Sequence, residues 1–235
     1  MDIEYMILDM DTTIRDLEER VKEFYSILDS GKSVAFVVKK DGLNYDRNIN
    51  YKNESKVLRE DIIKVIVDFS SEDIIVSTTG KSSRELFEIR EAKGQSHQYD
   101  FLTVGSMGHS SSIALSIALN KKDKRIWCID GDGAALMHLG SMAIIGEKRP
   151  KNFVHVLINN SAHESVGGQP TVAGSIEFQG IAESCGYKYT YSLEDLETLR
   201  TILSEIPKKE GPIFIEIKSA IGSRADLGRP TTTPA

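Results

Sequence analysis

The chain has 235 residues, of which 40% are apolar and 27% are charged, and its formal net charge at pH 7 is −6. This length allows one large domain with an appendage, and the composition is ordinary for a globular protein with a buried core. The acidic balance argues against nucleic-acid binding, because no basic block offsets it. No apolar run reaches the roughly 18 residues that a membrane span requires.

The two cysteines, Cys128 and Cys185, both lie in apolar stretches of the sequence. A disulfide framework or a zinc site would need more cysteines at closer spacing. Acidic residues stand near the N-terminus, where a secretory signal would carry basic ones. We therefore predict a cytoplasmic protein without a membrane anchor.

The first 43 residues predict a small strand–helix–strand unit. An apolar run at 3–8 precedes a helical pattern at 12–28, and a β-rich run follows at 33–38. Such a unit is too small to be an independent domain. Its second strand is apolar on both faces, so we expect neighbouring strands that the rest of the chain does not obviously supply. A polar stretch at 44–58 then predicts a linker.

Residues 59–235 predict an α/β domain, because helical and strand patterns alternate there. The expected helices are 60–69, 82–90, 109–120, 134–147, 176–185 and 193–205, and the expected strands are 73–77, 101–104, 125–130, 153–159, 188–191 and 212–218. Ser192 looks like the start of a capping box for the last helix. Such an alternation is typical of a doubly wound, mostly parallel sheet with helices on both faces.

Polar residues and glycines follow two successive strands of this predicted sheet. Gly131, Asp132 and Gly133 end the first strand, and Asn160 ends the second. Ligands bind at this edge of open α/β sheets, and carboxylate and amide oxygens suit Mg²⁺. The glycines and the helix expected from Ala134 present backbone N–H groups to a diphosphate. A simple tight turn is the alternative for this short motif.

The spacing of these segments resembles the cofactor motif of thiamine diphosphate-dependent decarboxylases, in which Gly-Asp-Gly, about 25 residues and Asn-Asn follow in order. Gly105, Ser106 and Met107 resemble the family segment that contacts the pyrimidine ring. The resemblance implies that the Gly105 carbonyl faces the 4′-amino group and that Met107 is the apolar wedge under the bent cofactor. An ordinary core methionine is the alternative for Met107.

Three stretches narrow the resemblance to phosphonopyruvate decarboxylases and the related sulfopyruvate decarboxylases: 105–109, 159–171 and 227–231. This resemblance covers 59–235. It implies a carboxy-lyase that uses thiamine diphosphate and Mg²⁺ to remove CO₂ from a small anionic 2-oxo acid, with phosphonopyruvate and its product phosphonoacetaldehyde favoured. By the family metal motif, the ligands are Asp132, Asn160 and the backbone carbonyl of Ala162.

Two histidines lie in the loops of this edge. His109 and His163 can hold an anionic substrate or move a proton near neutral pH, and each can instead bond a carbonyl and shape its loop. Glu164 is either an acid/base or a solvated loop carboxylate. Arg224 and Arg229 suit a phosphonate but fit a solvated, extended tail better.

Relatives of this kind carry a second, pyrimidine-binding domain whose glutamate activates the cofactor. We interpret 1–43 as the C-terminal remnant of that domain, and no glutamate there matches the family motif. The glutamate is then expected from a fused upstream domain or a separate subunit, in a homo- or hetero-oligomer. By this hypothesis the chain alone binds Mg²⁺ and thiamine diphosphate weakly and turns over nothing.

Two alternatives to a phosphonopyruvate decarboxylase stay open. The chain can be a beta-type subunit of a sulfopyruvate decarboxylase, or a non-catalytic regulatory module that binds thiamine diphosphate. A nicotinamide-binding domain is disfavoured, since the spacing Gly-x-Gly-x-x-Gly is absent at Gly131.

Overall fold

The computed structural model describes residues 3–43 and 51–232. The chain divides into two compact units, Met1–Asn50 and Tyr51–Ala235. Within the described ranges, no helix combines the length and the apolarity that crossing a bilayer demands.

The first unit is a strand–helix–strand arrangement, as predicted. It consists of β1 (Glu4–Leu8), α1 (Ile14–Asp29) and β2 (Val34–Val38), and the two strands pair in parallel. Thr13 and Asp16 form a capping box that starts the helix, and Phe24 packs its ring against Phe36 at a centroid distance of 5.0 Å. The opposite sheet face stays open in the described unit, where Tyr5 is 58% exposed.

The second unit contains a six-stranded sheet. Its strands are β3 (Ile74–Ser77), β4 (Asp100–Leu102), β5 (Ile126–Gly131), β6 (Phe153–Asn159), β9 (Tyr189–Leu193) and β10 (Ile213–Lys218). Its helices are α2 (Arg59–Ser70), α3 (Lys81–Ala92), α4 (Ser110–Asn120), α5 (Asp132–Met137), α6 (Ser141–Lys148), α7 (Phe178–Cys185) and α8 (Leu196–Glu205). A separate short antiparallel pair is formed by β7 (Ala162–His163) and β8 (Gln169–Pro170).

The strand order β4-β3-β5-β6-β10-β9 creates a switch point in the large sheet. All its pairs are parallel, and the chain proceeds from β3 to one side and then returns to place β5 on the other. The loops that follow β3 and β5 therefore diverge and leave a crevice between them, which is where such sheets bind ligands. This topology places the candidate site.

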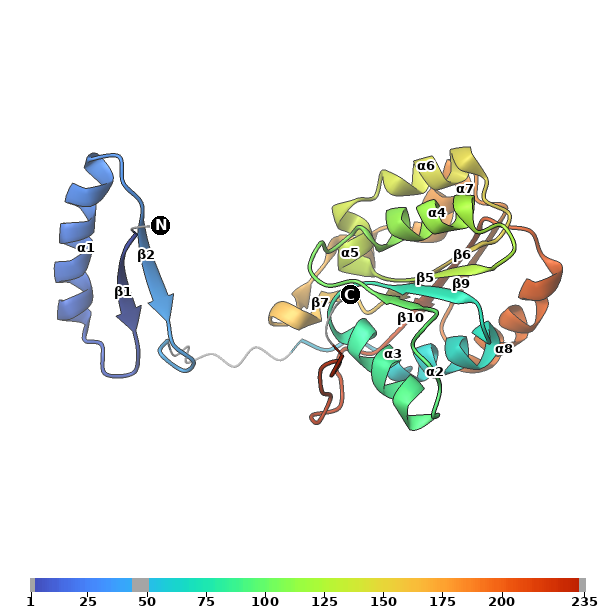
Figure 1. Cartoon of the computed structure of the whole chain (residues 1–235), viewed down its shortest axis with the longest axis horizontal. Coiled ribbons are helices and arrows are strands. Elements are labelled where there is room, and N and C mark those ends of the chain that lie inside the picture. The colour runs from blue at the N-terminus through green and yellow to red at the C-terminus, as the bar shows by residue number, and fades with distance from the viewer. Residues whose placement is uncertain (1–2, 44–50, 233–235) are drawn as a thin grey trace. The chain divides into compact units, whose positions relative to one another are not determined.

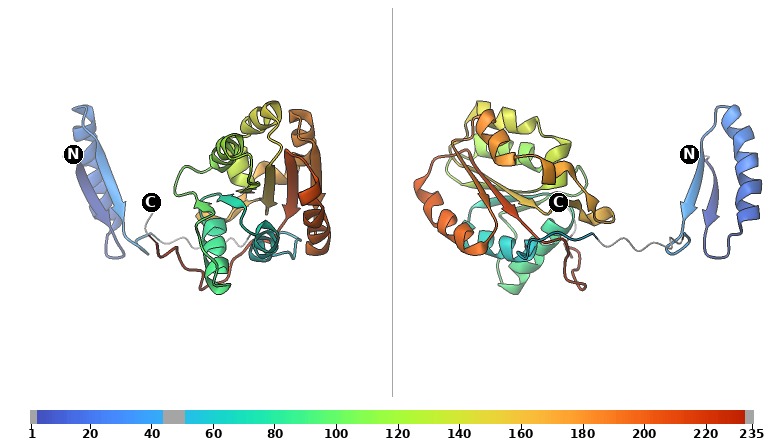
Figure 2. Two further views of the ribbon diagram at one scale, coloured as in Figure 1. Left: turned by 45° about the vertical axis from the view of Figure 1, so that its right-hand side comes forward. Right: turned by 180° about the vertical axis from the view of Figure 1, so that it is seen from behind.

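Helices cover both faces of this sheet, so its strands are apolar on both sides (Figures 1 and 2). α2, α3 and α8 lie on one face, where Trp127 and Ile129 join their core. α4, α6 and α7 lie on the other face, where Cys128 and Phe214 are buried. The predicted doubly wound architecture is confirmed, and the described sheet is entirely parallel.

The helix predicted at 134–147 is wrong as a single element. The structure has two short helices, α5 and α6, separated by a turn at 138–140. Gly140, a weak helix former, lies in this break. The apolar spacing on either side is compatible with one continuous helix, which is why periodicity alone missed the break.

The last helix begins later than predicted. Asp195 is its N-cap and accepts a hydrogen bond from the Thr198 N–H at 2.7 Å. Ser192 lies in β9 instead, where its hydroxyl donates to Glu216 at 3.0 Å. The predicted capping box at Ser192 is therefore wrong, because the strand extends through that residue.

The predicted linker falls partly outside the described residues, which omit 44–50. Its remainder is part of the second unit. Asn53 donates through Nδ2 to the backbone oxygens of Asn160 and Ser219, at 2.9 and 2.8 Å. The domain boundaries stay a prediction.

Candidate functional site

A pocket opens at the switch point, at the carboxyl ends of β3, β5 and β6. The lining residues on which the site depends are Thr78, Lys81, Met107, Asp132, Asn160 and His163. The loops that follow β3, β5 and β6 thus line one pocket together with the loop that precedes α4. Gly131, Gly133, Ala134 and Ala162 also line this pocket.

Asp132 is the first residue of α5, and it is 3% exposed. The Thr171 hydroxyl donates to its Oδ2 at 2.5 Å. Burial raises the pKa of the Asp132 carboxyl above its ordinary value, and the hydrogen bond from Thr171 offsets part of that rise. A desolvated carboxylate of this kind gains from a bound cation, so the environment of Asp132 fits a metal ligand.

The turn after β6 carries the second predicted ligand. Asn159 does not face the pocket, because its Oδ1 accepts from the Ser161 N–H at 2.9 Å and its Nδ2 donates to Glu216 at 2.7 Å. Ser161 takes a positive φ of 55°, which turns the chain sharply. The turn brings the Asn160 side chain and Ala162 to the pocket. A carboxylate, an amide oxygen and a backbone carbonyl are the donor types that Mg²⁺ accepts.

The pocket also fits an anion. A Cβ at Gly133 would lie 2.7 Å from His163 Nδ1, so a side chain there would fill the space. The Thr78 hydroxyl is buried without a hydrogen-bond partner among the described residues. Lys81 and Ser82 are the first residues of the twelve-residue helix α3. The Lys81 ammonium (which also contacts Glu164), the free Thr78 hydroxyl and the start of α3 surround a small cradle that suits a diphosphate.

This use of α3 was not predicted. The sequence predicts the diphosphate at a helix starting near Ala134, but α5 has only six residues. A short sequence signal for this use of α3 does exist. Thr78, Gly80 and Lys81 lie at the junction of β3 and α3, just as the Gly131 motif lies at the junction of β5 and α5.

The predicted pyrimidine segment forms a tight loop in which Gly105, Ser106 and Gly108 all have positive φ. Met107 reaches the pocket, and its Cε would lie 3.4 Å from a Cβ at Gly133. Gly105 and Ser106 are exposed and are not among the pocket-lining residues. Their contacts to a cofactor stay a prediction.

The two candidate histidines occupy different surroundings. His163 lines the pocket beside Gly133. His109 does not line it: its Nδ1 lies 3.1 Å from the Ser106 carbonyl oxygen, and its ring contacts that of His138. This contact shapes the loop, as in the alternative considered for His109. A catalytic role stays a prediction for both residues, and the geometry favours His163.

Glu164 is not a solvated loop carboxylate, since its side chain is 9% exposed. Arg59 and Lys81 bind it at 2.7 and 2.6 Å. Burial alone would raise the pKa of the Glu164 carboxyl, but the hydrogen bond from Lys81 and the charge of Arg59 outweigh burial and lower it. A carboxyl with a lowered pKa is a poor general acid because it stays ionised, and it is a weak general base because two cations hold its charge, so the structure disfavours the acid/base interpretation.

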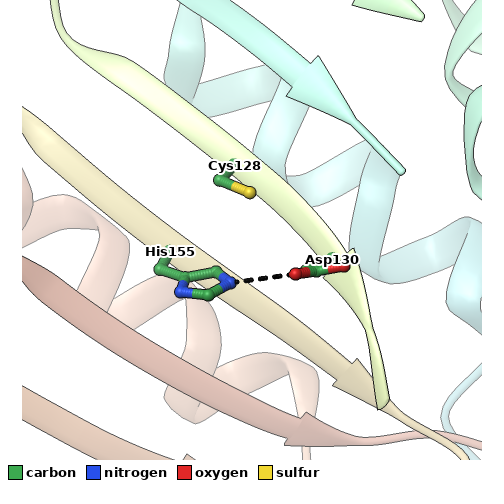
Figure 3. Close-up of side chains that lie close together, drawn as sticks. All are labelled: Cys128, Asp130 and His155. Atoms are coloured by element: carbon green, nitrogen blue, oxygen red, sulfur yellow. Dashed lines mark hydrogen bonds and ion pairs between the residues drawn. The ribbon is translucent and has the colours of Figure 1, made fainter. Parts of the chain in front are cut away.

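Asp130 on β5 and His155 on the neighbouring strand β6 form a buried polar contact close to the end of β5 (Figure 3). Asp130 accepts hydrogen bonds from the Gly131 N–H at 2.9 Å and from His155 Nε2 at 3.3 Å, and His155 Nδ1 lies 3.0 Å from the Tyr187 hydroxyl. The Cys128 thiol lies close by, with its pKa raised well above the ordinary value by burial. These contacts hold the backbone directly before Asp132.

The tail, as far as residue 232, does not line the pocket at the switch point. Arg224 pairs with Glu88 and Glu60, and the Gly228 N–H donates to Glu88 at 2.7 Å. The part of the tail that the structure describes is therefore fastened to α2 and α3 rather than free as expected, and the ion pairs of Arg224 disfavour the alternative in which it binds a phosphonate.

The fold and the pocket together define a cofactor-binding α/β domain with an anion cradle beside a hard-metal donor set. Residues 78–217 match the family model described as thiamine pyrophosphate enzyme, C-terminal TPP binding domain. The chain belongs to this thiamine pyrophosphate enzyme family. The family resemblance and the thiamine cofactor class predicted from the sequence are thereby confirmed.

Several of the relatives that the chain matches are named decarboxylases. A phosphonopyruvate decarboxylase from Streptomyces viridochromogenes is 34% identical over 73% of this chain and 42% of that protein. A sulfopyruvate decarboxylase subunit beta from Methanocaldococcus jannaschii is 46% identical over 59% of this chain and 73% of that subunit. The chain spans about two fifths of the length of the phosphonopyruvate decarboxylases it matches.

A solved structure agrees at the level of the fold. Benzoylformate decarboxylase from Polynucleobacter necessarius superimposes with a TM-score of 0.63 at 12% identity, over 83% of this chain and 43% of that chain.

Proposed function

We propose that this chain supplies the diphosphate-binding half of a decarboxylase site that uses thiamine diphosphate and Mg²⁺. The favoured reaction converts 3-phosphonopyruvate to phosphonoacetaldehyde and CO₂. The observation that carries this proposal is the pocket that gathers Asp132, Asn160 and Ala162 around the cradle at Gly133. The similarity to phosphonopyruvate decarboxylases supports the choice of substrate.

In this proposal the metal is held by the Asp132 carboxylate, the Asn160 amide oxygen and the Ala162 carbonyl. Gly133, Ala134 and the start of α3 with Thr78 and Lys81 hold the diphosphate. Bound thiamine diphosphate supplies the nucleophilic carbon and the electron sink that decarboxylation of a 2-oxo acid requires.

In this proposal, other residues of the chain contact the pyrimidine ring of the cofactor and the substrate. Met107 presents an apolar surface beside the cradle, and Gly105 and Ser106 meet the pyrimidine ring. His163, which lines the pocket, and His109 hold the substrate anion or move a proton near neutral pH.

The proposal requires a pyrimidine-binding domain or subunit that donates an activating glutamate, in a homo- or hetero-oligomer. We interpret residues 1–43 as the C-terminal part of such a domain. The open apolar face at Tyr5, Ile7 and Val37, each 44–58% exposed, supports this interpretation because parallel strands are normally covered.

A beta-type subunit of a sulfopyruvate decarboxylase is the second candidate. The 46% identity to such a subunit, over 73% of its length, favours it. With the pyrimidine-binding partner supplied, kcat/KM for phosphonopyruvate and for sulfopyruvate separates the two candidates. Turnover of neither substrate would favour a non-catalytic regulatory module.

Both candidate functions require that Asp132 binds Mg²⁺. Asp132→Asn in the full chain tests this requirement. Loss of a charged ligand in a buried metal site should abolish measurable binding of Mg²⁺ with thiamine diphosphate in calorimetry. Asp123→Asn, at an exposed turn, is the control and should bind as the wild type does. Unchanged cofactor binding by Asp132→Asn would show that the metal site is misplaced.

A further inference from the structure

The Glu164 carboxylate connects three separate elements of the second unit. It accepts from Arg59 Nη1 at the start of α2 and from Lys81 Nζ at the start of α3, at 2.7 and 2.6 Å. It also accepts from Asn160 Nδ2 in the turn after β6, at 3.0 Å. The carboxylate is thus bound by three donors in a largely buried setting.

Arg59 is itself held rigidly. Its Nε and Nη2 donate to the two carboxylate oxygens of Glu85, each at 2.7 Å, and the side chains of Arg59 and Glu85 are 7% and 1% exposed. A bidentate pair of this kind fixes the plane of the guanidinium. The remaining Nη1 is therefore aimed at Glu164, and the two cations balance the two carboxylates.

The contact from Asn160 to Glu164 decides how the Asn160 amide is turned. Nδ2 faces the Glu164 carboxylate, and Oδ1 accepts from the Ala162 N–H at 3.0 Å. A flipped amide would set its oxygen against the carboxylate and its NH₂ against the Ala162 N–H. Because an amide nitrogen only donates and an amide oxygen only accepts, both contacts would then be lost.

We propose that Glu164 is a positioning residue that orients the Asn160 amide so that Oδ1 is the atom offered to Mg²⁺, with Arg59 and Lys81 fixing the carboxylate in place. This proposal rests on the proposed function, because it takes Asn160 as a metal ligand. It assigns Glu164 neither to proton transfer nor to direct metal contact.

The first test is Glu164→Gln in the full chain. Lys81 contacts Oε1, whereas Arg59 and Asn160 both contact Oε2, so the single oxygen of an uncharged glutamine cannot keep all three contacts, and the hydrogen bond that orients the Asn160 amide is weakened. The dissociation constant of Mg²⁺, measured by calorimetry with excess thiamine diphosphate, should rise about 10- to 100-fold, as for other residues that orient metal ligands. Glu210→Gln, which loses only a surface pair with Lys151, is the control and should match the wild type.

The second test separates orientation from a general structural role. In Asn160→Asp both carboxylate oxygens can bind the metal, so a rotation of the carboxylate by half a turn no longer changes which atom type faces Mg²⁺. Adding Glu164→Gln to Asn160→Asp should then weaken Mg²⁺ binding by no more than about twofold, or strengthen it. An equal loss in both backgrounds, or a lowered Tm with an unchanged dissociation constant, overturns the proposal.

A third measurement does not depend on cofactor binding. The NMR signals of the Asn160 side-chain NH₂, assigned with Asn160→Asp, should shift and exchange faster with solvent in Glu164→Gln. Unchanged signals overturn the proposal even where the metal data cannot be collected. A wild-type chain that binds no Mg²⁺ with thiamine diphosphate would instead contradict the proposed function, so the two failures are distinguishable.

Discussion

Thr171 joins the two parts of the candidate metal site at the scale of single residues. Its hydroxyl donates to Asp132, and its backbone N–H donates to the Ser161 carbonyl at 2.9 Å. Asp132 follows β5, whereas Ser161 follows β6. One residue of the long loop therefore fixes a ligand on one strand end against the turn that follows the next.

Replacement of Thr171 by valine removes the hydroxyl and keeps the shape of the side chain. Asp132 then loses the hydrogen bond that offsets its burial, so its charged form becomes less favourable. We expect the dissociation constant of Mg²⁺, with thiamine diphosphate present, to rise about tenfold in calorimetry.

The matched control for Thr171→Val is Thr201→Val, because the Thr201 hydroxyl donates only to the Glu197 carbonyl on an exposed helix face. This variant should bind Mg²⁺ as the wild type does. Equal affinities for Thr171→Val and the wild type would mean that Thr171 does not support the metal ligand.

At the scale of secondary-structure elements, α6 and α7 pack unusually close together. A Cβ at Gly146 would overlap the Cys185 carbonyl oxygen. The two helices can approach this closely only because residue 146 has no side chain. This contact fixes α6 against α7.

Gly146→Ala should therefore destabilise the second unit through a backbone clash. We expect a loss of about 1–3 kcal/mol in the free energy of unfolding, measured by urea denaturation. Gly140→Ala is the control, since nothing lies within 4 Å of its Cβ position. If Gly146→Ala proves as stable as Gly140→Ala, the helices do not approach as closely as described.

At the scale of the whole molecule, the two units differ in the size of their apolar cores. Both large apolar clusters and all residues that line the candidate pocket lie within Tyr51–Ala235. The unit Met1–Asn50 has far fewer buried apolar side chains, Leu8 and Phe24 among them. A core this small does not offset the entropy of folding by itself.

We expect a fragment of residues 51–235 to unfold cooperatively, with the Tm of the main transition of the full chain. It should also bind Mg²⁺ and thiamine diphosphate with the affinity of the full chain, because every proposed ligand is retained. Calorimetry checks both properties. A fragment that loses cooperative unfolding would show that the second unit depends on the first.

Much of the element order was predictable because its signals are local. The alternation of strands and helices follows from apolar periodicity and turn residues, and the strand predicted at 153–159 matches β6 in both bounds. The break at Gly140 and the late start of α8 were missed, because the same local pattern fits either alternative.

The Gly131 motif and the Asn160 turn were predicted to meet, since successive parallel strands with a helical connection often pair. β5 and β6 do pair, with Gly131 beside Ile158. The sequence by itself therefore determined the alternation, the family and the two strand ends of the candidate metal site, because each depends on residues close together in the chain.

Only the tertiary structure decided which other side chains reach that site. The placement of β3 next to β5 brings Thr78 and Lys81 to the pocket. Arg59 meets Glu85 and Glu164 across 26 and 105 positions of the chain. Strand order and long-range ion pairs leave no periodic trace in a sequence, because they depend on which elements pack together after the chain has folded.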